Sequence, residues 1–314
     1  MKTSILVPIT CYLASARRAF FTAAASILLV AGVNIITTSA SAQGINDRYY
    51  RFEEGIAGDC ASGTGSIIDS YFGSPDGTPE GCPVYSTDVP FAVIPLTGQP
   101  DTLSLSFSGA QSILFTSYFL LHRTYGDATL EYFIKMPDQA RHAIFWTRPD
   151  NINTNRFDLA VNPGGLLDGD YMSPDGILHR PIGGGSLLLN QWHHVAIVKD
   201  TVTAPPGDYY YGYVDGVLTY TSYDRTPDEP DPNLNWTISG RVGYQLTALI
   251  DEVRLTQRAL APCDFLISSS PCSSPTPTGT PSPTATPSPT PTGTPCTGRC
   301  SPTPRPRPTP APRP

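Results

Sequence analysis

The segment from Trp192 to Thr221 constrains the fold most strongly, because it combines two β-type runs with a tight turn. Its first eight residues, Trp192 to Lys199, are apolar or aromatic apart from two histidines and the closing lysine. An exposed sheet face would need a polar residue at every second position, so this run predicts a strand buried on both faces. Asp215-Gly216 predicts a type I′ turn, since both positions of that turn need a positive φ. Two prolines and a glycine between Asp200 and Asp208 predict that strand pairing stops there.

Short β-type runs, separated by glycine, proline, asparagine and aspartate, continue along residues 43–268. In Thr102 to Phe107, large apolar residues alternate with threonine and serine, which predicts a strand with one buried face. Helical periodicity is confined to a short turn near Pro262 to Leu266. The pattern predicts an all-β fold, a two-sheet antiparallel β-sandwich of the jelly-roll type. Further predicted strands are 48–52, 112–115, 128–135, 143–147 and 156–161.

Residues 1–42 have the composition of an export signal. Arg17-Arg18 precede an apolar run from Ala19 to about Thr38, and Ala40-Ser41-Ala42 provides a small-residue cleavage site. The paired arginines resemble a twin-arginine signal, which we weigh equally against an ordinary secretory one. The alternative is an uncleaved membrane anchor, because the run is almost long enough to span a bilayer. The cleavage site favours removal, so we expect no transmembrane span in the mature chain.

Residues 269–314 form a Pro/Thr/Ser-rich tail. They contain 16 of the 34 prolines and no acidic residue, and Pro-Thr-Gly-Thr-Pro occurs at 277–281 and again at 291–295. Such a segment lacks the apolar residues needed for a core, so we expect it to be disordered and extended. It acts either as a solvated spacer or as a stalk that associates with the cell wall.

The remaining segment, 43–268, is the one candidate globular domain, and its length suits a single all-β unit. It holds 13 Lys and Arg against 27 Asp and Glu, a net charge of −14. Such a surface repels phosphate backbones, which argues against nucleic-acid binding. Divalent cations or neutral partners fit this charge better.

Six cysteines remain after the predicted cleavage, an even number that suggests three disulfides in an oxidising compartment. Fifteen pairings are open, and pairing between sequence neighbours is the simplest. A zinc site is disfavoured, because no C-x-x-C pair or nearby histidine completes a four-ligand set. The six are Cys60, Cys82, Cys263, Cys272, Cys296 and Cys300.

Several motifs occur in an order that resembles the laminin G-like, concanavalin A-like jelly-roll superfamily of lectins and glucanases. The resemblance covers nearly all of residues 46–268, and it implies the sandwich without implying any chemistry. It also implies calcium at a loop rim, since relatives often bind it there, without locating the ligands. The motifs are Tyr49-Tyr50-Arg51-Phe52-Glu53, Leu105-Ser106-Phe107-Ser108-Gly109, Asn190-Gln191-Trp192-His193-His194-Val195-Ala196, Tyr213-Val214-Asp215-Gly216-Val217 and Leu249-Ile250-Asp251-Glu252-Val253-Arg254-Leu255.

The sequence offers no recognisable catalytic pair. A retaining glucanase needs two carboxylates about 5 Å apart, and members of the superfamily with that activity carry Glu-x-Asp-x-x-Glu, which is missing here. Asp251 and Glu252 are adjacent, so on a strand they should point to opposite faces and pair with Arg254 or Arg241. His193 and His194 should diverge for the same reason and serve as buried, hydrogen-bonded structural residues. We therefore expect no enzyme.

Two kinds of binding residue are predicted. Asp150 and Asn153, in an oxygen-rich loop, are candidate calcium ligands, and the acidic loop from Asp224 is a second candidate. Trp146, Asn151 and Tyr171 are candidate contacts to a sugar, which is bound by exposed aromatic faces beside amide and carboxylate groups. Packing within the domain is the alternative, favoured even for Trp146.

The sequence thus predicts a secreted or surface-displayed, non-catalytic binding module for a glycan or an extracellular protein, with calcium as a candidate cofactor. One alternative is a structural envelope protein that is tethered by its Pro-rich tail. Another is a polysaccharide hydrolase or lyase with an unfamiliar site.

Overall fold

The computed structural model describes residues 47–71, 76–116, 126–148, 157–172, 178–203, 206–225, 235–270 and 272. The chain divides into Met1–Gln43 and Gly44–Pro314, and every described residue belongs to the second unit. The predicted export signal and nearly all of the predicted tail lie outside the described residues. Within them, no helix has the length and apolar character needed to cross a bilayer.

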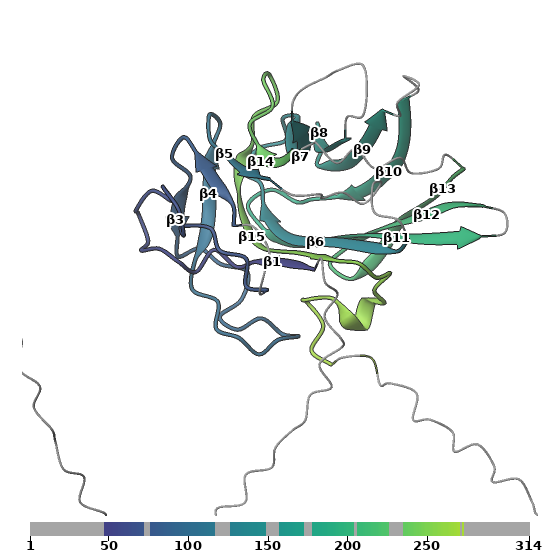
Figure 1. The fold of residues 1–314 in the computed structure, drawn as a ribbon, viewed down its shortest axis with the longest axis horizontal. Coiled ribbons are helices and arrows are strands. Elements are labelled where there is room, and N and C mark those ends of the chain that lie inside the picture. Colours follow the sequence, from purple (N-terminus) through teal and green to yellow (C-terminus); the bar gives the residue numbers. More distant parts are fainter. Residues whose placement is uncertain are drawn as a thin grey trace, which may run out of the picture. The chain divides into compact units, whose positions relative to one another are not determined.

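Two antiparallel sheets form the described domain, which confirms the predicted all-β sandwich (Figure 1). The eight-stranded sheet contains β1 (Arg48–Tyr50), β3 (Val84–Ser86), β4 (Ser104–Ser108), β6 (Ala128–Lys135), β11 (Trp192–Thr203), β12 (Pro206–Val214), β13 (Val217–Asp224) and β15 (Thr247–Thr256). The seven-stranded sheet contains β2 (Thr78–Glu80), β5 (Ser112–Phe115), β7 (His142–Arg148), β8 (Phe157–Asn162), β9 (Leu166–Met172), β10 (Leu178–Ser186) and β14 (Asn235–Ser239).

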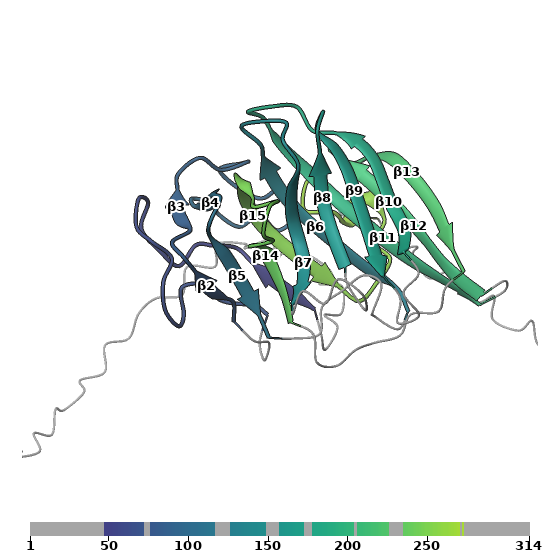
Figure 2. The same cartoon turned by 90° about the horizontal axis from the view of Figure 1, so that it is seen from above.

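The strand orders place sequence-distant segments side by side (Figure 2). The first sheet runs β13-β12-β11-β6-β15-β4-β3, with β1 also paired to β15, and the second runs β10-β9-β8-β7-β14-β5-β2. The last strand, β15, therefore lies inside its sheet, between β6 and β4. A 3-10 turn, η1 (Pro262–Asp264), follows β15 at the predicted position.

The opening hairpin forms largely as predicted. Asp215 and Gly216 have φ values of 51° and 74°, the two positive angles that a type I′ turn needs. From His193 to Lys199, β11 is buried throughout. One prediction is wrong: pairing between β11 and β12 continues to Thr203 opposite Pro206. Proline is tolerated here because it is the first residue of β12, where its missing N–H does not interrupt the hydrogen bonds of the following residues.

One apolar core fills the space between the sheets, and alternation along the strands builds it. On β6, Leu130, Tyr132 and Ile134 belong to this core, so Glu131 and Phe133 face the other side of the sheet. Both are nevertheless buried. The outer face of the eight-stranded sheet must therefore be covered.

Two segments of chain provide that cover. The connection between β3 and β4 packs Phe91 edge-on against Phe133, with ring centroids 5.6 Å apart. The C-terminal cover, residues 257–268, packs Phe265 against His194 at 5.6 Å. In Figure 1 this yellow-green segment lies on the side of β6 and β11 away from the seven-stranded sheet. The cover makes the outer face of this sheet internal at β6 and the first part of β11, whereas β13 is exposed or half-buried throughout.

Two disulfides join neighbouring cysteines, as the simplest pairing predicts. Cys60 bonds to Cys82 and Cys263 bonds to Cys272, with Cα atoms 5.1 and 5.0 Å apart. The predicted pair Cys296 and Cys300 lies outside the described residues.

We expect the double substitution Cys60→Ser/Cys82→Ser to lower the free energy of unfolding by ~3 kcal/mol, because the bond closes a 22-residue separation in the unfolded chain. Urea denaturation of the oxidised protein measures the change. Cys263→Ser/Cys272→Ser is the control, and its nine-residue separation predicts a smaller loss. A larger loss in the control would contradict the loop-closure argument.

Candidate functional site

Neither aromatic residue predicted from the sequence presents a free ring to a ligand. Trp146, on β7, is 3% exposed, and its Nε1–H donates to the Ser239 carbonyl at 2.9 Å. Tyr171, on β9, is 4% exposed, stacks on His179 at 4.7 Å, and donates its hydroxyl to Asp224 at 2.6 Å. The prediction of exposed sugar platforms is wrong for both, because strand packing buries them. The alternative of packing within the domain is confirmed for Trp146.

The predicted calcium ligands Asp150 and Asn153, and the predicted ligand contact Asn151, lie outside the described residues. Their roles stay predictions.

The paired histidines are structural, as predicted. His193 Nδ1 lies 2.8 Å from Asp215 Oδ2, and His194 Nε2 lies 2.9 Å from Glu131 Oε2. Each imidazole thus has its own carboxylate, on a different side of β11. Because the two rings diverge, they do not share a metal ion.

The outer face of the seven-stranded sheet also carries charged groups. On β8 and β9, the residues that alternate with the core residues include Asp158, Asp168 and Asp170, so these three face outward. Asp158 is paired with Trp146 on β7 and with Asp170 on β9, which aligns an indole and two carboxylates in one row across three strands. We call this surface the β7–β9 face.

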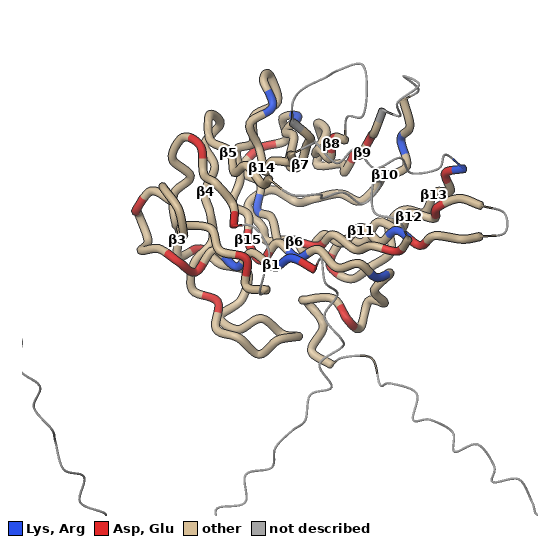
Figure 3. Tube along the Cα trace, viewed as in Figure 1, with Lys and Arg blue, Asp and Glu red and all other residues tan. Residues whose placement is uncertain are grey.

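Two arginines add positive charge to the β7–β9 face. Arg141 lies 3.6 Å from Asp158 and 3.8 Å from Asp168, and Arg241 also pairs with Asp158. Both guanidinium groups lie 5.0 Å from the ring centroid of Tyr244. Interleaved acidic and basic segments are visible at this end of the sheet in Figure 3.

Part of this charged network is accessible. The side chains of Arg141 and Asp168 are 31% and 20% exposed, and Tyr244 is 39% exposed, whereas the Asp158 side chain is 1% exposed. Asn162 donates from its amide to Asp168 Oδ2 at 2.9 Å, which orients the accessible carboxylate. Guanidinium, carboxylate and amide groups around an aromatic ring are suited to binding polyhydroxylated ligands.

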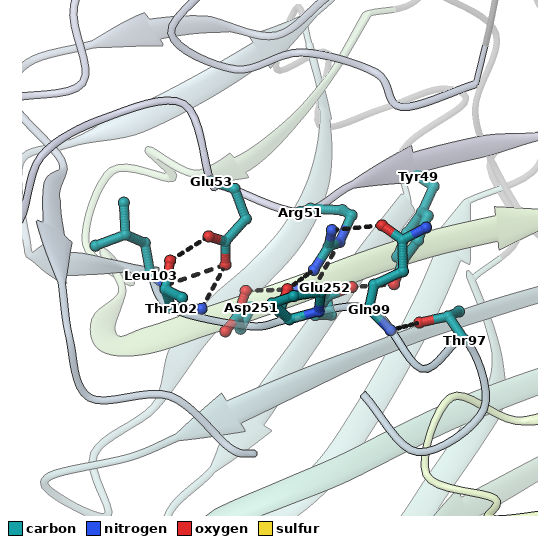
Figure 4. Close-up of polar contacts among 10 residues, drawn as sticks. Tyr49, Arg51, Glu53, Thr97, Gln99, Thr102, Leu103, Asp251 and Glu252 are labelled. Carbon is teal, nitrogen blue, oxygen red and sulfur yellow. Dashed lines mark hydrogen bonds and ion pairs between the residues drawn. The ribbon is translucent and has the colours of Figure 1, made fainter. Parts of the chain in front are cut away.

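A second polar site, the acidic cluster, consists of Glu53, Asp101, Asp251 and Glu252. Glu53 follows β1, Asp101 precedes β4, and the other two lie on β15. Oxygens of Glu53, Asp101 and Glu252 lie within 4.8 Å of one another. Figure 4 shows Glu53, Asp251 and Glu252 in this region.

The prediction that Asp251 and Glu252 point to opposite faces is wrong. Their register with β6 shifts between Asp251 and Arg254, and Glu252 has a φ of 50°, so the local alternation is broken. The predicted arginine partners are wrong as well. Glu252 pairs with Arg51 at 3.0 Å, whereas Arg254 pairs with Glu131.

Hydrogen bonds hold some oxygens of the acidic cluster. Glu53 accepts from the backbone N–H groups of Thr102 at 2.7 Å and Leu103 at 3.1 Å. Glu252 accepts from Arg51 Nε at 3.0 Å and from the Tyr49 hydroxyl. These bonds are drawn in Figure 4. They fix the positions of two of the four carboxylates.

Burial and mutual repulsion raise pKa values in the acidic cluster. Burial is the largest cause for Asp101, whose pKa rises to about 7, and the charges of Glu252 and Glu53 add to it. Burial also raises the pKa of Glu252 to about 7, although Tyr49 and Arg51 oppose the shift. Burial, with the charges of Asp101 and Glu252, raises the pKa of Asp251 well above its usual range. These shifts favour the protonated, neutral forms of the three buried carboxyl groups.

One other group of potential metal ligands occurs among the described residues, formed by Cys263, Asp264 and Cys272. Its two sulfurs are joined in a disulfide, so they cannot act as thiolate ligands.

A surface pocket of about 350 Å³ lies beside the Cys60–Cys82 disulfide. Glu54 lines it and accepts from the Ile68 N–H at 3.2 Å, and burial raises the pKa of Glu54 to about 7. Asp59 and Tyr85 also line this pocket.

Comparisons with known proteins identify the fold. A family model described as the concanavalin A-like lectin/glucanases superfamily matches residues 107–264. No curated protein sequence matches the chain. Domain 4 of AbnA, a GH43 extracellular arabinanase from Geobacillus stearothermophilus solved with arabinotriose, is similar at a TM-score of 0.50 and 16% identity, over 70% of this chain and 95% of that domain.

The botulinum neurotoxin serotype G binding domain has a TM-score of 0.48 and 11% identity, over 70% of this chain and 49% of that one. This chain thus spans about half the length of that domain. Likeness to the arabinanase domain at 16% identity shows a shared fold alone. The family match covers half of the chain and agrees with the two-sheet architecture and the motifs quoted from the sequence. The chain belongs to the concanavalin A-like lectin/glucanase superfamily.

Proposed function

We propose that this protein is a secreted or surface-displayed, non-catalytic module that binds a glycan or an extracellular protein through the β7–β9 face. The contrast between the two outer sheet surfaces carries the proposal. The eight-stranded sheet is covered at β6 and β11 by the chain itself, whereas the β7–β9 face, although buried at Trp146, Asp158 and Asp170, keeps Arg141, Asp168 and Tyr244 accessible. Two disulfides support an oxidising compartment.

A glycan is the ligand that we favour. Planar polar side chains around an aromatic ring can hydrogen-bond sugar hydroxyls and contact the apolar face of the ring. The arabinanase domain, which shares the fold, was solved with arabinotriose, and this supports the same class of ligand. A protein ligand is the alternative.

The distribution of acids supports a non-catalytic role. A glycosidase needs one carboxylic acid with a raised pKa and a second carboxylate, both able to reach the sugar bond. Among the described residues, the carboxyls with raised pKa values are Glu54, Asp101, Asp251 and Glu252. None belongs to the β7–β9 face, and the last three are buried.

We expect the full chain to bind one class of oligosaccharide on a glycan array, and Asp168→Asn to weaken that binding by about 10-fold or more, as loss of a charged hydrogen-bond partner does. Calorimetry with the best array ligand measures the change. Asp59→Asn removes the same charge at an exposed position outside the face and should bind like the unmodified protein. Equal affinities for both variants would remove the β7–β9 face as the site.

A chain that binds neither glycans nor extracellular proteins would overturn the binding function. Cell fractionation with and without residues 269–314 then tests the structural alternative, since a tethering protein is released when its tail is deleted. Release of reducing ends from polysaccharides would instead support a hydrolase.

A further inference from the structure

A row of half-buried tyrosines lies on the outer face of β12 and β13, and we call it the tyrosine stripe. Tyr210 belongs to the core between the sheets, so the tyrosines on either side of it face outward. The rings of Tyr209 and Tyr211 are nearly parallel, with centroids 6.1 Å apart and an interplanar angle of 20°. Tyr223 pairs with Tyr209 across the strands, and the two ring centroids are 4.8 Å apart. The stripe consists of Tyr209, Tyr211, Tyr213 and Tyr223, and it forms an aromatic surface that is partly open to solvent.

The C-terminal cover ends beside the tyrosine stripe. Phe265 meets Tyr213 edge-on, with ring centroids 5.1 Å apart. Ile267 packs with Tyr211 and Tyr213 against the same small apolar cluster. A disulfide to Cys263 then holds the last described residue close to the cover. The chain therefore leaves the described domain next to the stripe, and the Pro/Thr/Ser-rich tail begins there.

The tail has a sequence period that suits an aromatic surface. Its prolines recur every six residues, at 275, 281 and 287 and again at 277, 283, 289 and 295. A polyproline II helix has three residues per turn and rises ~3.1 Å per residue, so residues six apart share a side of it at ~19 Å spacing. In that helix, the segment 275–295 carries prolines along two sides. Proline-rich segments bind aromatic-lined surfaces at a low entropic cost, because their helix is formed in advance.

Hydrogen bonding and charge are complementary as well. Proline has no N–H, so a proline-rich chain presents mainly carbonyl acceptors, and tyrosine hydroxyl groups donate to such acceptors. The segment 275–295 has no charged side chain, so it covers aromatic rings without burying a charge. Four arginines follow it in the tail, whereas residues 43–268 carry a net charge of −14, and Asp200 lies directly opposite Tyr209. Attraction between the basic end and the acidic domain favours a tail that stays on the domain.

We infer that residues 275–295 of the tail dock on the tyrosine stripe of their own chain. From Tyr209 to Tyr213 the stripe is about 13 Å long at ~3.3 Å per residue, so one six-residue repeat covers it. The successive repeats offer equivalent registers. The short connection from the cover gives the tail an effective concentration on the order of 1 mM, so a Kd of about 1 mM keeps it docked for about half of the time. The stripe belongs to the eight-stranded sheet and is separate from the β7–β9 face.

Photo-crosslinking in the full chain tests the contact. The photoreactive residue p-benzoylphenylalanine takes the place of Tyr211, and mass spectrometry after irradiation locates the peptides joined to it. We expect bonds within one chain to residues 275–295. The matched control carries the same group in place of Val217, which is exposed, follows Gly216 beside Ile267, and pairs with the core residue Val214 on the other face of the hairpin. A tail that is merely tethered nearby reaches both positions, so docking requires at least ~10-fold more product at position 211.

Two changes should reduce the product at position 211 to the level of the control. Tyr209→Thr removes a ring and keeps a residue that favours strands. The second change, Pro281→Ala/Pro283→Ala/Pro287→Ala/Pro289→Ala, removes the repeat and alters no residue of the described domain, so it remains informative if Tyr209→Thr fails to fold. A synthetic peptide of residues 275–295, added at several times its ~1 mM Kd, should compete with the tail to the same extent.

Equal product at positions 211 and 217 would overturn the inference. So would bonds that join two chains, because the occupant would then be the tail of a second copy. Suppression by a glycan from the array, with no effect of the peptide or of the proline substitutions, would make the stripe a glycan site instead. The effect of Asp168→Asn on glycan binding is measured at the other sheet, so the two proposals fail separately.

Discussion

Replacing Arg254 with methionine should lower the free energy of unfolding by about 3–5 kcal/mol, because it leaves a buried carboxylate without its cation. Arg254 Nε donates to Glu131 Oε1 at 2.5 Å, and the Glu131 side chain is 1% exposed. Burial alone would raise the pKa of Glu131, but Arg254 and His194 lower it below its ordinary value. The same arginine donates from Nη2 to the Asp264 carbonyl at 2.6 Å and so also holds the C-terminal cover. Urea denaturation measures the loss.

The control for Arg254→Met is a partly exposed ion pair at the end of β6, the strand that carries Glu131. Lys135 Nζ lies 2.6 Å from Asp88, but the two side chains are 25% and 42% exposed. Water screens such a pair, so Lys135→Ala should cost about 0–1 kcal/mol. The double variant Glu131→Gln/Arg254→Met should recover part of the loss by removing the orphaned charge. Equal losses for Arg254→Met and Lys135→Ala would contradict the importance of burial.

Trp236→Ala is expected to cost about 3–5 kcal/mol, because it opens a cavity in the centre of the core. Trp236, on β14, is 1% exposed and stacks on Phe115 with centroids 3.8 Å apart and an interplanar angle of 10°. Tyr50 and Phe145 contact the same ring, at 6.3 and 6.0 Å. These neighbours come from both sheets, so a smaller residue loosens the contact between them. Thermal and urea unfolding should both show the effect.

Val242→Ala is the matched truncation at the surface. Val242 is 83% exposed, so its loss should change stability by less than about 0.5 kcal/mol. Trp236→Phe keeps an aromatic ring and should fall between the two. A loss below about 1 kcal/mol in Trp236→Ala would show that the core repacks around the gap.

The sequence predicts those strands whose hydrophobic pattern is continuous. The run 128–135 is predicted and observed with the same limits, because its residues are β-formers and seven of its eight positions are buried. Strand β10 is not predicted, since Pro181 and the glycines 183–185 resemble a loop. In the structure the pairing of β10 with β9 shifts register within this segment, including between Gly184 and Ser186. Gly185 has a φ of 76° and lies so close to Val214 that a side chain at this position would collide with it.

The candidate sites are harder to predict, because both depend on contacts between distant segments. Asp168-Gly169-Asp170 carries a local signal, since alternating acids on a strand face one side together. Arg141 precedes β7 and Arg241 follows β14, so the two arginines come near these acids only in the folded chain. For the acidic cluster no local pattern exists. Glu53 and Glu252 lie far apart in sequence, and the bulge that brings Asp251 and Glu252 to one site follows from pairing, which alternation alone cannot predict.

The position of β15 has a kinetic consequence. Tyr49 and Glu252 are 203 residues apart, yet they are hydrogen-bonded, and β1, β4 and β6 all take β15 as a neighbour. Such contacts give a high contact order, so folding should be slow and should wait for the last strand. A nascent chain that lacks residues 247–256 leaves its eight-stranded sheet in three unjoined parts, β13-β12-β11-β6, β4-β3 and β1. The order of strands thus delays the native state until synthesis of the domain is nearly complete.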